Sequence, residues 1–373
     1  MVTNKNKNYT IWDRLANYFS IDIGLDLGTA NVVVYIKDKG IVANEPSVVA
    51  VQRDRLGDIN ILAVGDEAKL MIGKTPGSIE AIRPLKEGVI ADFEVTQKML
   101  EYFISKYHRN NFLVRPRVVV SVPIGITPVE KRAVVEAAES AGAREVYLIE
   151  ETMAAALGAE MDSVLNSRGG MIIDIGGGTT GISVISLGGL VISRSIKTAG
   201  DSMNNAIIDY VKKTYNILIG ENMAETVKKT IADVTESPSE SLQMQVRGRS
   251  LDSGLPTSID LNSLDTKKAL DLSVQEIITA VRETLDATPP ELAGDIIVDG
   301  IVLAGGGALL GGLCERISSA TKLKVTVGEE PLLCVVKGCG KALEEINTLR
   351  TVSYTHLRAH ETGRNLVCRL LLE

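Results

Sequence analysis

Runs of apolar residues that end at glycines are the most regular pattern in this chain. Residues 171–173 are all apolar and predict a buried strand, which is followed directly by Asp174 and a cluster of glycines. The same order recurs about half a chain upstream, where an apolar strand ends at Asp26 and a new strand pattern starts at Val32. A third apolar stretch, residues 296–302, also leads into glycines. Three such corners, two of them near copies, predict a duplicated domain.

The residues at these corners suit a bound phosphate and a magnesium ion. Glycine has no side chain to block a ligand, and consecutive backbone amides in such a turn form an anion-binding concavity. A carboxylate beside a phosphate requires a cation between them, so we expect Mg²⁺ at Asp26 and Asp174, held through water. We expect both corners to contribute residues to nucleotide binding. These are Gly28, Thr29, Ala30 and Asn31 from the first corner and Gly176, Gly177, Gly178, Thr179 and Thr180 from the second. The alternative is an ordinary glycine-rich hairpin turn with a capping aspartate.

The spacing of apolar residues elsewhere predicts alternating helices and strands. Helices are expected over residues 96–107, 128–142, 151–159, 203–215, 262–285 and 309–318. Strand patterns cover residues 117–122, 145–150, 189–197 and 296–303, and residues 242–259 alternate as a hairpin. This arrangement predicts an α/β fold with mixed sheets, because each copied corner joins antiparallel strands.

Composition limits the class of protein. The chain has 373 residues, of which 45% are hydrophobic and 23% charged, enough for one large or two moderate domains. A net charge of −7 argues against nucleic-acid binding, and no apolar run approaches the roughly 18 residues of a membrane span. Four cysteines without a CxxC pair and only three histidines argue against a zinc site, so we expect reduced cytosolic thiols.

Two segments could contact a membrane surface. Near the N-terminus, one helical face gathers Ile11, Trp12, Leu15, Tyr18 and Phe19. An amphipathic segment of this kind either lies in the membrane interface or packs on the domain. Further along, Phe112 and Leu113 stand among arginines, which suits an anionic lipid surface; the alternative is a loop whose apolar pair folds back onto the protein.

Five longer motifs resemble one protein family. They are VPIGITPVEKRAV (122–134), LIEETMAAALGA (148–159), DIGGGTTGISVISLG (174–188), TPPELAGDII (288–297) and LAGGGALLGGL (303–313). Over residues 21–349 the chain resembles the actin superfamily of ATPases and, within it, the MreB family of bacterial actin homologues. The resemblance implies an actin-like (ribonuclease H-like), duplicated two-domain α/β fold with a central nucleotide cleft. It divides the chain into a tail (1–20), domain I (21–152), domain II (153–349) with an inserted subdomain (about 203–270), and a last segment (350–373).

The resemblance also implies a function. Members of this family bind ATP with Mg²⁺, polymerise into filaments, hydrolyse ATP slowly and scaffold cell-wall elongation in rod-shaped bacteria. The expected partners are further copies of the chain, the anionic cytoplasmic surface of the cell membrane, and membrane proteins of the elongation machinery. Two other kinds of protein share the same ATP core, a sugar or acetate kinase and a heat-shock-type chaperone. The chaperone would need a substrate-binding domain after that core, which we do not expect here.

Matching the motifs residue by residue gives the implied site. The family's catalytic glutamate corresponds to Glu130, and Asp174 and Thr179 complete the catalytic set. A carboxylate facing the terminal phosphate can align the attacking water. From the residues alone, the alternative is that Glu130 complements the positive N-terminus of its helix. Further nucleotide contacts are implied at Gly200, Asp201, Glu221, Glu225, Lys228, Gly305, Gly306 and Gly307. For the charged residues of 221–228, the alternative is a solvated helix face.

The chain departs from the family pattern at three positions and at its end. Thr152 stands where the family usually has proline, Gly181 where relatives commonly carry an acidic residue, and Asn222 where an arginine is usual. The segment after about residue 350 has no family counterpart and resembles translated adaptor sequence joined to a truncated gene, so it is left out of the fold prediction. It contains His356 and His360, whose spacing could otherwise indicate a metal site.

Overall fold

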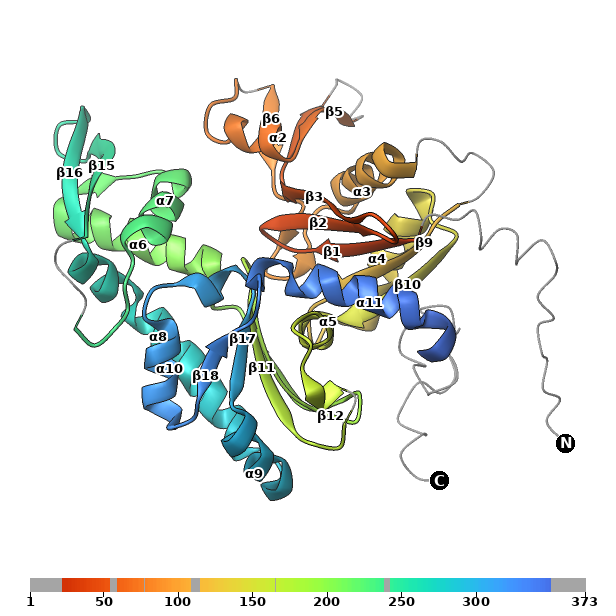
Figure 1. The fold of residues 1–373 in the computed structure, drawn as a ribbon. Helices are drawn as coiled ribbons and strands as arrows, with labels where there is room; N and C mark the ends of the chain where they lie inside the picture. The colour runs from red at the N-terminus through yellow and green to blue at the C-terminus, as the bar shows by residue number, and fades with distance from the viewer. Residues whose placement is uncertain are drawn as a thin grey trace, which may run out of the picture.

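The computed structural model describes residues 22–53, 59–76, 78–108, 115–164, 166–237 and 242–349, with the elements labelled in Figure 1. The amphipathic segment near the N-terminus, the pair Phe112 and Leu113, and the last segment with His356 and His360 lie outside these residues. What the sequence predicts for them stays a prediction.

One half of the molecule is built on a five-stranded mixed sheet with the order β10-β9-β1-β2-β3. Its strands are β1 (Ile23–Leu27), β2 (Asn31–Ile36), β3 (Gly40–Pro46), β9 (Arg117–Val122) and β10 (Glu145–Glu150). β1 runs antiparallel to β2 and parallel to β9, which is parallel to β10. Alternate strand residues face a core that α3 (Phe93–His108) and α4 (Pro128–Ser140) complete.

The other half repeats this plan with the strand order β13-β12-β11-β17-β18. Its strands are β11 (Gly170–Ile175), β12 (Thr180–Ser186), β13 (Gly189–Ile196), β17 (Ile301–Ala304) and β18 (Val325–Val327). β11 runs antiparallel to β12 and parallel to β17, as β1 does to β2 and β9. The core of this half also contains α6 (Gly200–Tyr215), α7 (Glu221–Ile231), α8 (Ser263–Asp286) and α10 (Leu313–Thr321). The prediction of two similar mixed sheets is confirmed.

Two helices, α5 (Glu151–Gly158) and α11 (Cys334–Leu349), connect the two sheets. They share a buried cluster with Val119 and Tyr147 from the first sheet and Ile172 and Ile185 from the second. Figure 1 shows both helices between the sheets. The packing is tight, because a Cβ atom on Gly338 would overlap the carbonyl oxygen of Ala154. The two halves are therefore joined by a close helix pair.

Smaller units extend from each half. In the first half, β4 (Val49–Arg53), β5 (Ile59–Val64) and β6 (Ile79–Ile82) form a small sheet beside α2 (Asp66–Met71), and the pair β7 (Leu85–Lys86) and β8 (Val89–Ile90) follows. In the second half, another small sheet is formed by β14 (Ile217–Leu218), β15 (Gln243–Ser250) and β16 (Pro256–Asn262).

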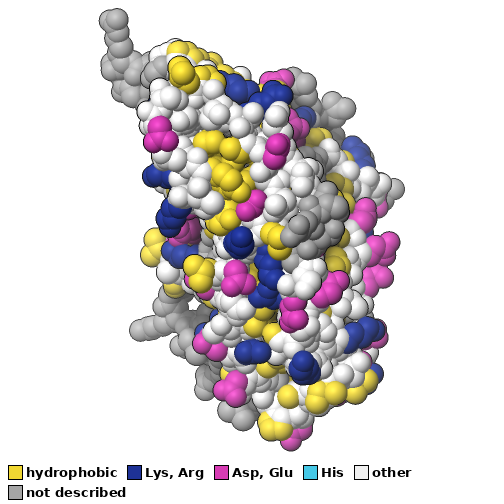
Figure 2. All heavy atoms as spheres, turned by 90° about the vertical axis from the view of Figure 1, so that its left-hand side faces the viewer, with side chains coloured by type: hydrophobic (Ala, Val, Ile, Leu, Met, Phe, Trp, Pro, Cys, Tyr) yellow, Lys and Arg dark blue, Asp and Glu magenta, His cyan; other side chains and the backbone are white. Residues whose placement is uncertain are grey.

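Basic and acidic side chains are interspersed on the face in Figure 2. Within the described residues, no helix combines the length and apolarity needed to cross a membrane.

Two predicted elements are wrong in part. Residues 296–299 belong to α9 (Pro290–Asp299) and not to a strand, and β17 begins only at Ile301. The β-branched residues of this run suggest a buried strand, but only Ile296 is buried, whereas Ile297 is 68% exposed on the helix surface. Gly300, with a φ of 82°, separates the helix from the strand. The helix expected from residue 309 starts at Leu313, after the 3₁₀ turn η2 (Gly306–Leu309), because a second glycine pair interrupts it.

Candidate nucleotide-binding site

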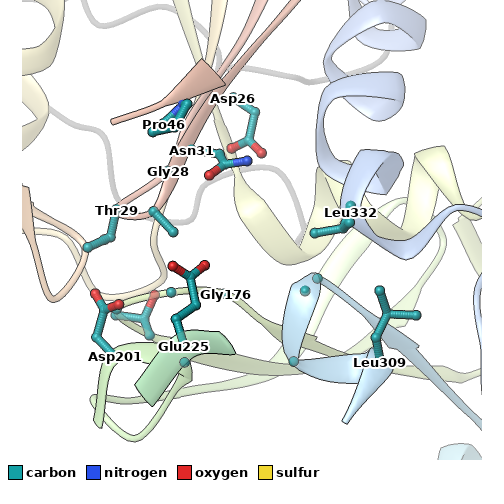
Figure 3. A pocket seen from close by; sticks show the side chains of 18 of the residues that line it. Asp26, Gly28, Thr29, Asn31, Pro46, Gly176, Asp201, Glu225, Leu309 and Leu332 are labelled. Carbon is teal, nitrogen blue, oxygen red and sulfur yellow. The ribbon is translucent and has the colours of Figure 1, made fainter. Parts of the chain in front are cut away.

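A cavity of about 560 Å³ lies where the three glycine corners meet. Ligand sites in proteins commonly measure about 300 to 1,000 Å³. The corners after β1, β11 and β17 converge there from distant parts of the sequence (Figure 3). The cavity brings together most of the predicted site residues, which are Asp26, Gly28, Thr29, Ala30, Asn31, Asp174, Gly176, Gly177, Gly178, Thr179, Gly200, Asp201, Glu225, Lys228, Gly305, Gly306 and Gly307.

The two copied corners face each other at close range. A Cβ atom added to Gly177 would lie 2.5 Å from the Cβ atom of Ala30, and one added to Gly178 would lie 2.6 Å from Thr29 Oγ1. Both distances are too short for a real side chain, so only glycine fits. Thr29 Oγ1 also accepts a hydrogen bond from the backbone amide of Gly88 at 3.1 Å. The corners therefore present mainly backbone to a ligand held between them.

Three acidic side chains line the cavity beside the corners, namely Asp26, Asp174 and Glu151. Burial raises the pKa of Asp26 from 3.8 to about 6, although a 2.7 Å hydrogen bond from Ser121 Oγ opposes the shift. Burial, and then the charge of Asp26, raises the pKa of Asp174. Burial followed by the charges of Asp174 and Asp26 raises the pKa of Glu151 well above its ordinary value. The cavity thus concentrates acidic groups that a bound cation would neutralise.

This acidic cluster suits a hydrated magnesium ion. Among the described residues, no three His, Cys, Asp or Glu side chains are placed to hold a metal ion directly. Mg²⁺ usually keeps several waters and is bound by one or two carboxylates together with substrate phosphates. Asp26 and Asp174, on facing corners, match that donor set, so the residues present fit the ion.

Glu151 is not part of the predicted site, although the sequence carries a signal for it. It follows directly on β10, as Asp26 and Asp174 stand near the carboxyl ends of β1 and β11. Because β1, β9 and β10 are parallel, their carboxyl ends share one edge of the sheet, which is where ligands bind in α/β proteins. A carboxylate directly after a predicted buried strand is the feature that could have identified Glu151.

The start of α6 is tied to the corner after β11. The amides of Gly200 and Asp201 donate to the carbonyl oxygens of Gly176 and Gly177 at 3.1 and 2.8 Å. From α7, Lys228 Nζ donates to the carbonyl oxygen of Gly200 at 2.6 Å. Burial lowers the pKa of Lys228 to about 8. These contacts form a polar wall of the cavity.

Ion pairs connect the two halves beside this wall. Lys69 Nζ lies 2.9 Å from Glu225 Oε2, and Arg83 lies 3.2 Å from Asp201 and 2.7 Å from Glu221. The basic residues come from the small unit of the first half, whereas the acidic ones come from α6 and α7. Lys69 and Arg83 also line the cavity, and neither is in the predicted site. Isolated lysines and arginines give no signal in the sequence that they face a ligand.

The wall on the far side of the cavity is apolar. Figure 3 shows Leu309 and Leu332 lying away from Asp201 and Glu225. The lining on this side consists of Leu309, Leu310, Pro331, Leu332 and Val335. An apolar slot beside polar groups suits a planar base attached to a charged remainder. Leucines and valines look like ordinary core residues in a sequence, so no pattern identifies this wall beforehand.

Two predicted nucleotide contacts, Thr180 and Glu221, are not among the residues that line the cavity. Thr180 is fully buried, and its hydroxyl donates to the carbonyl oxygen of Thr198 at 2.7 Å. Thr180 is the first residue of β12, and its side chain is buried there, whereas Thr179 remains at the corner and lines the cavity. Glu221 instead forms the ion pair with Arg83.

Glu130, the predicted catalytic glutamate, also lies outside the cavity lining. Its carboxylate accepts hydrogen bonds from the amide and the hydroxyl of Thr127 at 2.7 and 2.6 Å, and Thr127 Oγ1 accepts one from the Glu130 amide at 3.2 Å. The Thr127 hydroxyl, followed by the Thr127 amide, lowers the pKa of Glu130. This is a reciprocal cap at the start of α4. The contact matches the helix-capping alternative, and the water-aligning role implied for Glu130 stays a prediction.

Two similar glycine-cornered sheets closed around one cavity are the arrangement of actin-like nucleotide-binding proteins. The crystal structure of MreB 5 of Spiroplasma citri bound to AMPPNP matches this fold with a TM-score of 0.84 and 38% identity, covering 89% of this chain and 98% of that one. The cell shape-determining protein MreB of Escherichia coli K12 is 51% identical over 331 residues, 88% of this chain and 95% of the relative. Cell shape-determining protein Mbl of Bacillus subtilis 168 is 48% identical over 89% of this chain and 98% of the relative. A family model described as MreB/Mbl protein matches residues 20–351, and the chain belongs to that family.

Proposed function

We propose that this protein binds ATP with Mg²⁺ in the cavity, polymerises into filaments and hydrolyses the nucleotide slowly. The observation that carries the proposal is the convergence of three glycine corners and the acidic cluster of Asp26, Asp174 and Glu151 on one cavity. The AMPPNP in the structure of the Spiroplasma citri relative supports a nucleotide as the ligand. The actin-like fold supports self-association through copies of the same chain.

Each part of the cavity receives a role in this proposal. The corners after β1 and β11 bind phosphate oxygens through backbone amides and the hydroxyls of Thr29 and Thr179. Asp26 and Asp174 hold Mg²⁺ through water, and the bound ion neutralises charge on the phosphates. Gly305 to Gly307 and the apolar wall hold the adenosine part.

We assign the positioning of the attacking water to Glu151. Hydrolysis of a terminal phosphate needs an oriented in-line nucleophile and little covalent help from the protein. The Glu151 carboxyl group lines the same cavity as the corners, whereas the Glu130 carboxylate is bound to its own helix start. We therefore prefer Glu151 for this role, the assignment of Glu130 implied by the resemblance stays a prediction, and Asp174 and Thr179 are kept beside either glutamate.

At the cellular level, we propose that the filaments scaffold cell-wall elongation and set rod shape at the cytoplasmic face of the membrane. The names of the MreB and Mbl relatives, which describe them as cell shape-determining, support this part. Membrane contact is assigned to the N-terminal amphipathic segment and to Phe112 and Leu113, with membrane proteins of the elongation machinery as partners. We keep the domain limits 21–152 and 153–349, with the inserted subdomain at about 203–270.

One pair of assays tests the proposal against a kinase of the same superfamily. Sedimentation with and without Mg-ATP should show nucleotide-dependent pelleting, and phosphate release should be slow and need no acceptor. A sugar or acetate kinase would transfer phosphate to its acceptor at about 1 to 100 per second and stay in the supernatant. Fast acceptor-dependent turnover without pelleting would overturn the proposed function.

A further inference from the structure

A buried serine lies directly behind the first glycine corner. Ser121, on β9, is 2% exposed and is not among the residues that line the cavity. Its Oγ atom donates a hydrogen bond to Asp26 Oδ1 at 2.7 Å and accepts one from the backbone amide of Leu27 at 3.3 Å. A serine hydroxyl has one hydrogen, and an amide can only donate, so that hydrogen is left for Asp26. The backbone of the corner therefore fixes the direction in which the hydroxyl donates.

This contact holds one side of a carboxylate that lines the cavity (Figure 3). Because Ser121 engages Oδ1, the Asp26 side chain is held in one orientation and Oδ2 remains for a ligand. Carboxylates that bind metal ions are commonly held in this way, and the groups behind them contribute strongly to the affinity for the metal. Ser121 can thus influence the cavity without reaching it.

The equivalent position in the other half has no such hydroxyl. The paired residues of β1 and β9 stop one position before Asp26 and Ser121, which come next in the same register. Between β11 and β17, the corresponding pair is Asp174 and Ala304. The second sheet forms its corner with alanine at this place, so pairing of the strands does not require a hydroxyl there. The serine is a particular feature of the corner with Asp26.

We propose that Ser121 is a positioning residue for the magnesium ion, because it holds Asp26 by Oδ1 and leaves Oδ2 for the waters of the ion. This inference rests on the proposed binding of Mg-ATP. Asp26 is then the fixed carboxylate of the pair, whereas Asp174 has no hydroxyl at the equivalent position to hold it. A carboxylate that is already oriented loses less conformational freedom when the ion binds, which strengthens binding.

The test is calorimetry of ATP binding to the full chain, once with Mg²⁺ and once with EDTA in place of Mg²⁺. The quantity to compare is the factor by which Mg²⁺ tightens ATP binding. Ser121→Ala should reduce this factor about 10-fold, the low end of the loss seen when a group that orients a metal-binding side chain is removed. Its affinity for ATP without Mg²⁺ should stay close to that of wild type, because the phosphate corners keep their backbone contacts.

Ser183→Ala is the matched control. Ser183 is also a fully buried strand serine, it does not line the cavity, and its hydroxyl is hydrogen-bonded to that of Thr152 at 2.8 Å. The control therefore loses a buried hydrogen bond whose partner is a hydroxyl and not a carboxylate. It should leave the Mg²⁺ factor unchanged.

A double variant separates positioning from general support of the corner. In an Asp26→Asn background, which lacks the charged carboxylate, adding Ser121→Ala should change the Mg²⁺ factor little, because the two changes act on one interaction. A wild-type factor in Ser121→Ala, an equal loss of ATP affinity with and without Mg²⁺, or a full additional loss in the Asp26→Asn background would overturn the positioning role. A wild type that binds no ATP, or whose ATP binding does not respond to Mg²⁺, would instead overturn the proposed function.

Discussion

Three acidic side chains lie close together around the cavity, those of Asp26, Asp174 and Glu151. Their closeness has opposite effects on the stability of the protein and on the binding of a ligand. Without a cation, ionising any of them in a buried setting disfavours the folded state, as their raised pKa values show. With a cation and a nucleotide, the same carboxylates gain a partner. Groups that destabilise the empty protein and support the loaded one are typical of binding sites.

Replacing Asp26 with asparagine should therefore separate the two effects. The folded pKa of Asp26, about 6, lies above the ordinary value of 3.8, so the folded state holds its proton more tightly and stability falls as the pH rises through that window. In nucleotide-free, metal-free protein at about pH 7.5, Asp26→Asn should raise the free energy of unfolding by about 1 to 2 kcal/mol. At about pH 4 the gain should largely disappear. Urea unfolding at both pH values measures it.

The same variant should bind Mg-ATP more weakly, because it removes a carboxylate assigned to the hydrated ion. Calorimetry with ATP in the presence and absence of Mg²⁺ gives the comparison. If wild type and Asp26→Asn were equally stable at both pH values and bound Mg-ATP with equal affinity, the role of Asp26 in holding the hydrated ion would be refuted.

Glu151 and Glu130 give a direct test of which glutamate positions water. Glu151→Ala should keep nucleotide binding and slow phosphate release by about 10² or more, the usual contribution of such a group. Glu130→Ala should lower stability by about 0.3 to 1 kcal/mol, because it removes the glutamate half of the capping box while Thr127 remains, and should leave phosphate release nearly unchanged. Single-turnover phosphate release and thermal unfolding of both variants measure these effects. Slow release in Glu130→Ala and normal release in Glu151→Ala would restore the assignment implied by the resemblance.

Two positions at which the resemblance implies a departure from the family pattern, Thr152 and Gly181, meet in the structure. A Cβ atom on Gly181 of β12 would lie 2.8 Å from Thr152 Cγ2 of α5. The hydroxyl of Thr152 lies 2.8 Å from that of Ser183, also on β12, and the two are hydrogen-bonded. The absence of a side chain at position 181 leaves room for the threonine methyl group. The two substitutions, unrelated in the sequence, therefore fit each other across the boundary between α5 and β12.

At the scale of elements, local patterns predicted what depends on neighbours in the sequence. The corners after β1 and β11 were predictable because a buried strand, an aspartate and glycines stand in one short run. Glu151 also follows a strand directly, but no glycines stand beside it to strengthen that signal, and its approach to Asp174 depends on how β10 and β11 are placed in space. The strand predicted at 296–299 failed for a similar reason: whether Ile297 is exposed is decided by packing, and its β-branched side chain suggests a strand in either case.

The contact between α5 and α11 predicts a strong effect of a single methyl group. A Cβ atom on Gly338 would overlap the carbonyl oxygen of Ala154, and backbone cannot move aside cheaply. Gly338→Ala should therefore lower the free energy of unfolding by about 1 to 3 kcal/mol. Gly294→Ala is the control, because Gly294 lies in α9 and its added Cβ would meet no described atom within 4 Å beyond its chain neighbours and its own helix backbone. That change should stabilise by about 0.5 to 1 kcal/mol, as alanine normally does in a helix. A neutral Gly338→Ala in denaturant unfolding would show that the helix pair is loosely packed.

At the scale of the whole molecule, the two halves are held together in two different ways. The α5 and α11 pair is buried and close-packed, so it resists separation. The ion pairs of Lys69 and Arg83 with α6 and α7 lie beside the cavity and are partly exposed. Partly exposed ion pairs contribute little energy each, and salt screens them. We therefore expect the weaker connection to be the one that opens when the proposed nucleotide exchanges.

Breaking one of these ion pairs should speed nucleotide release without altering the cavity wall. Glu221 is the residue to change, because it pairs with Arg83 at 2.7 Å but does not line the cavity. Glu221→Gln should raise the dissociation rate of a fluorescent ATP analogue about 2- to 5-fold at low salt, as expected for loss of one ion pair of up to about 1 kcal/mol. In stopped-flow measurements, the difference from wild type should shrink at high salt, because screening weakens the wild-type pair as well. Arg132→Gln serves as the control, since it removes a surface pair with Glu136 on α4 and leaves both halves untouched. Equal dissociation rates for wild type and Glu221→Gln at low salt would mean that opening is limited by the packed helices and not by the ion pairs.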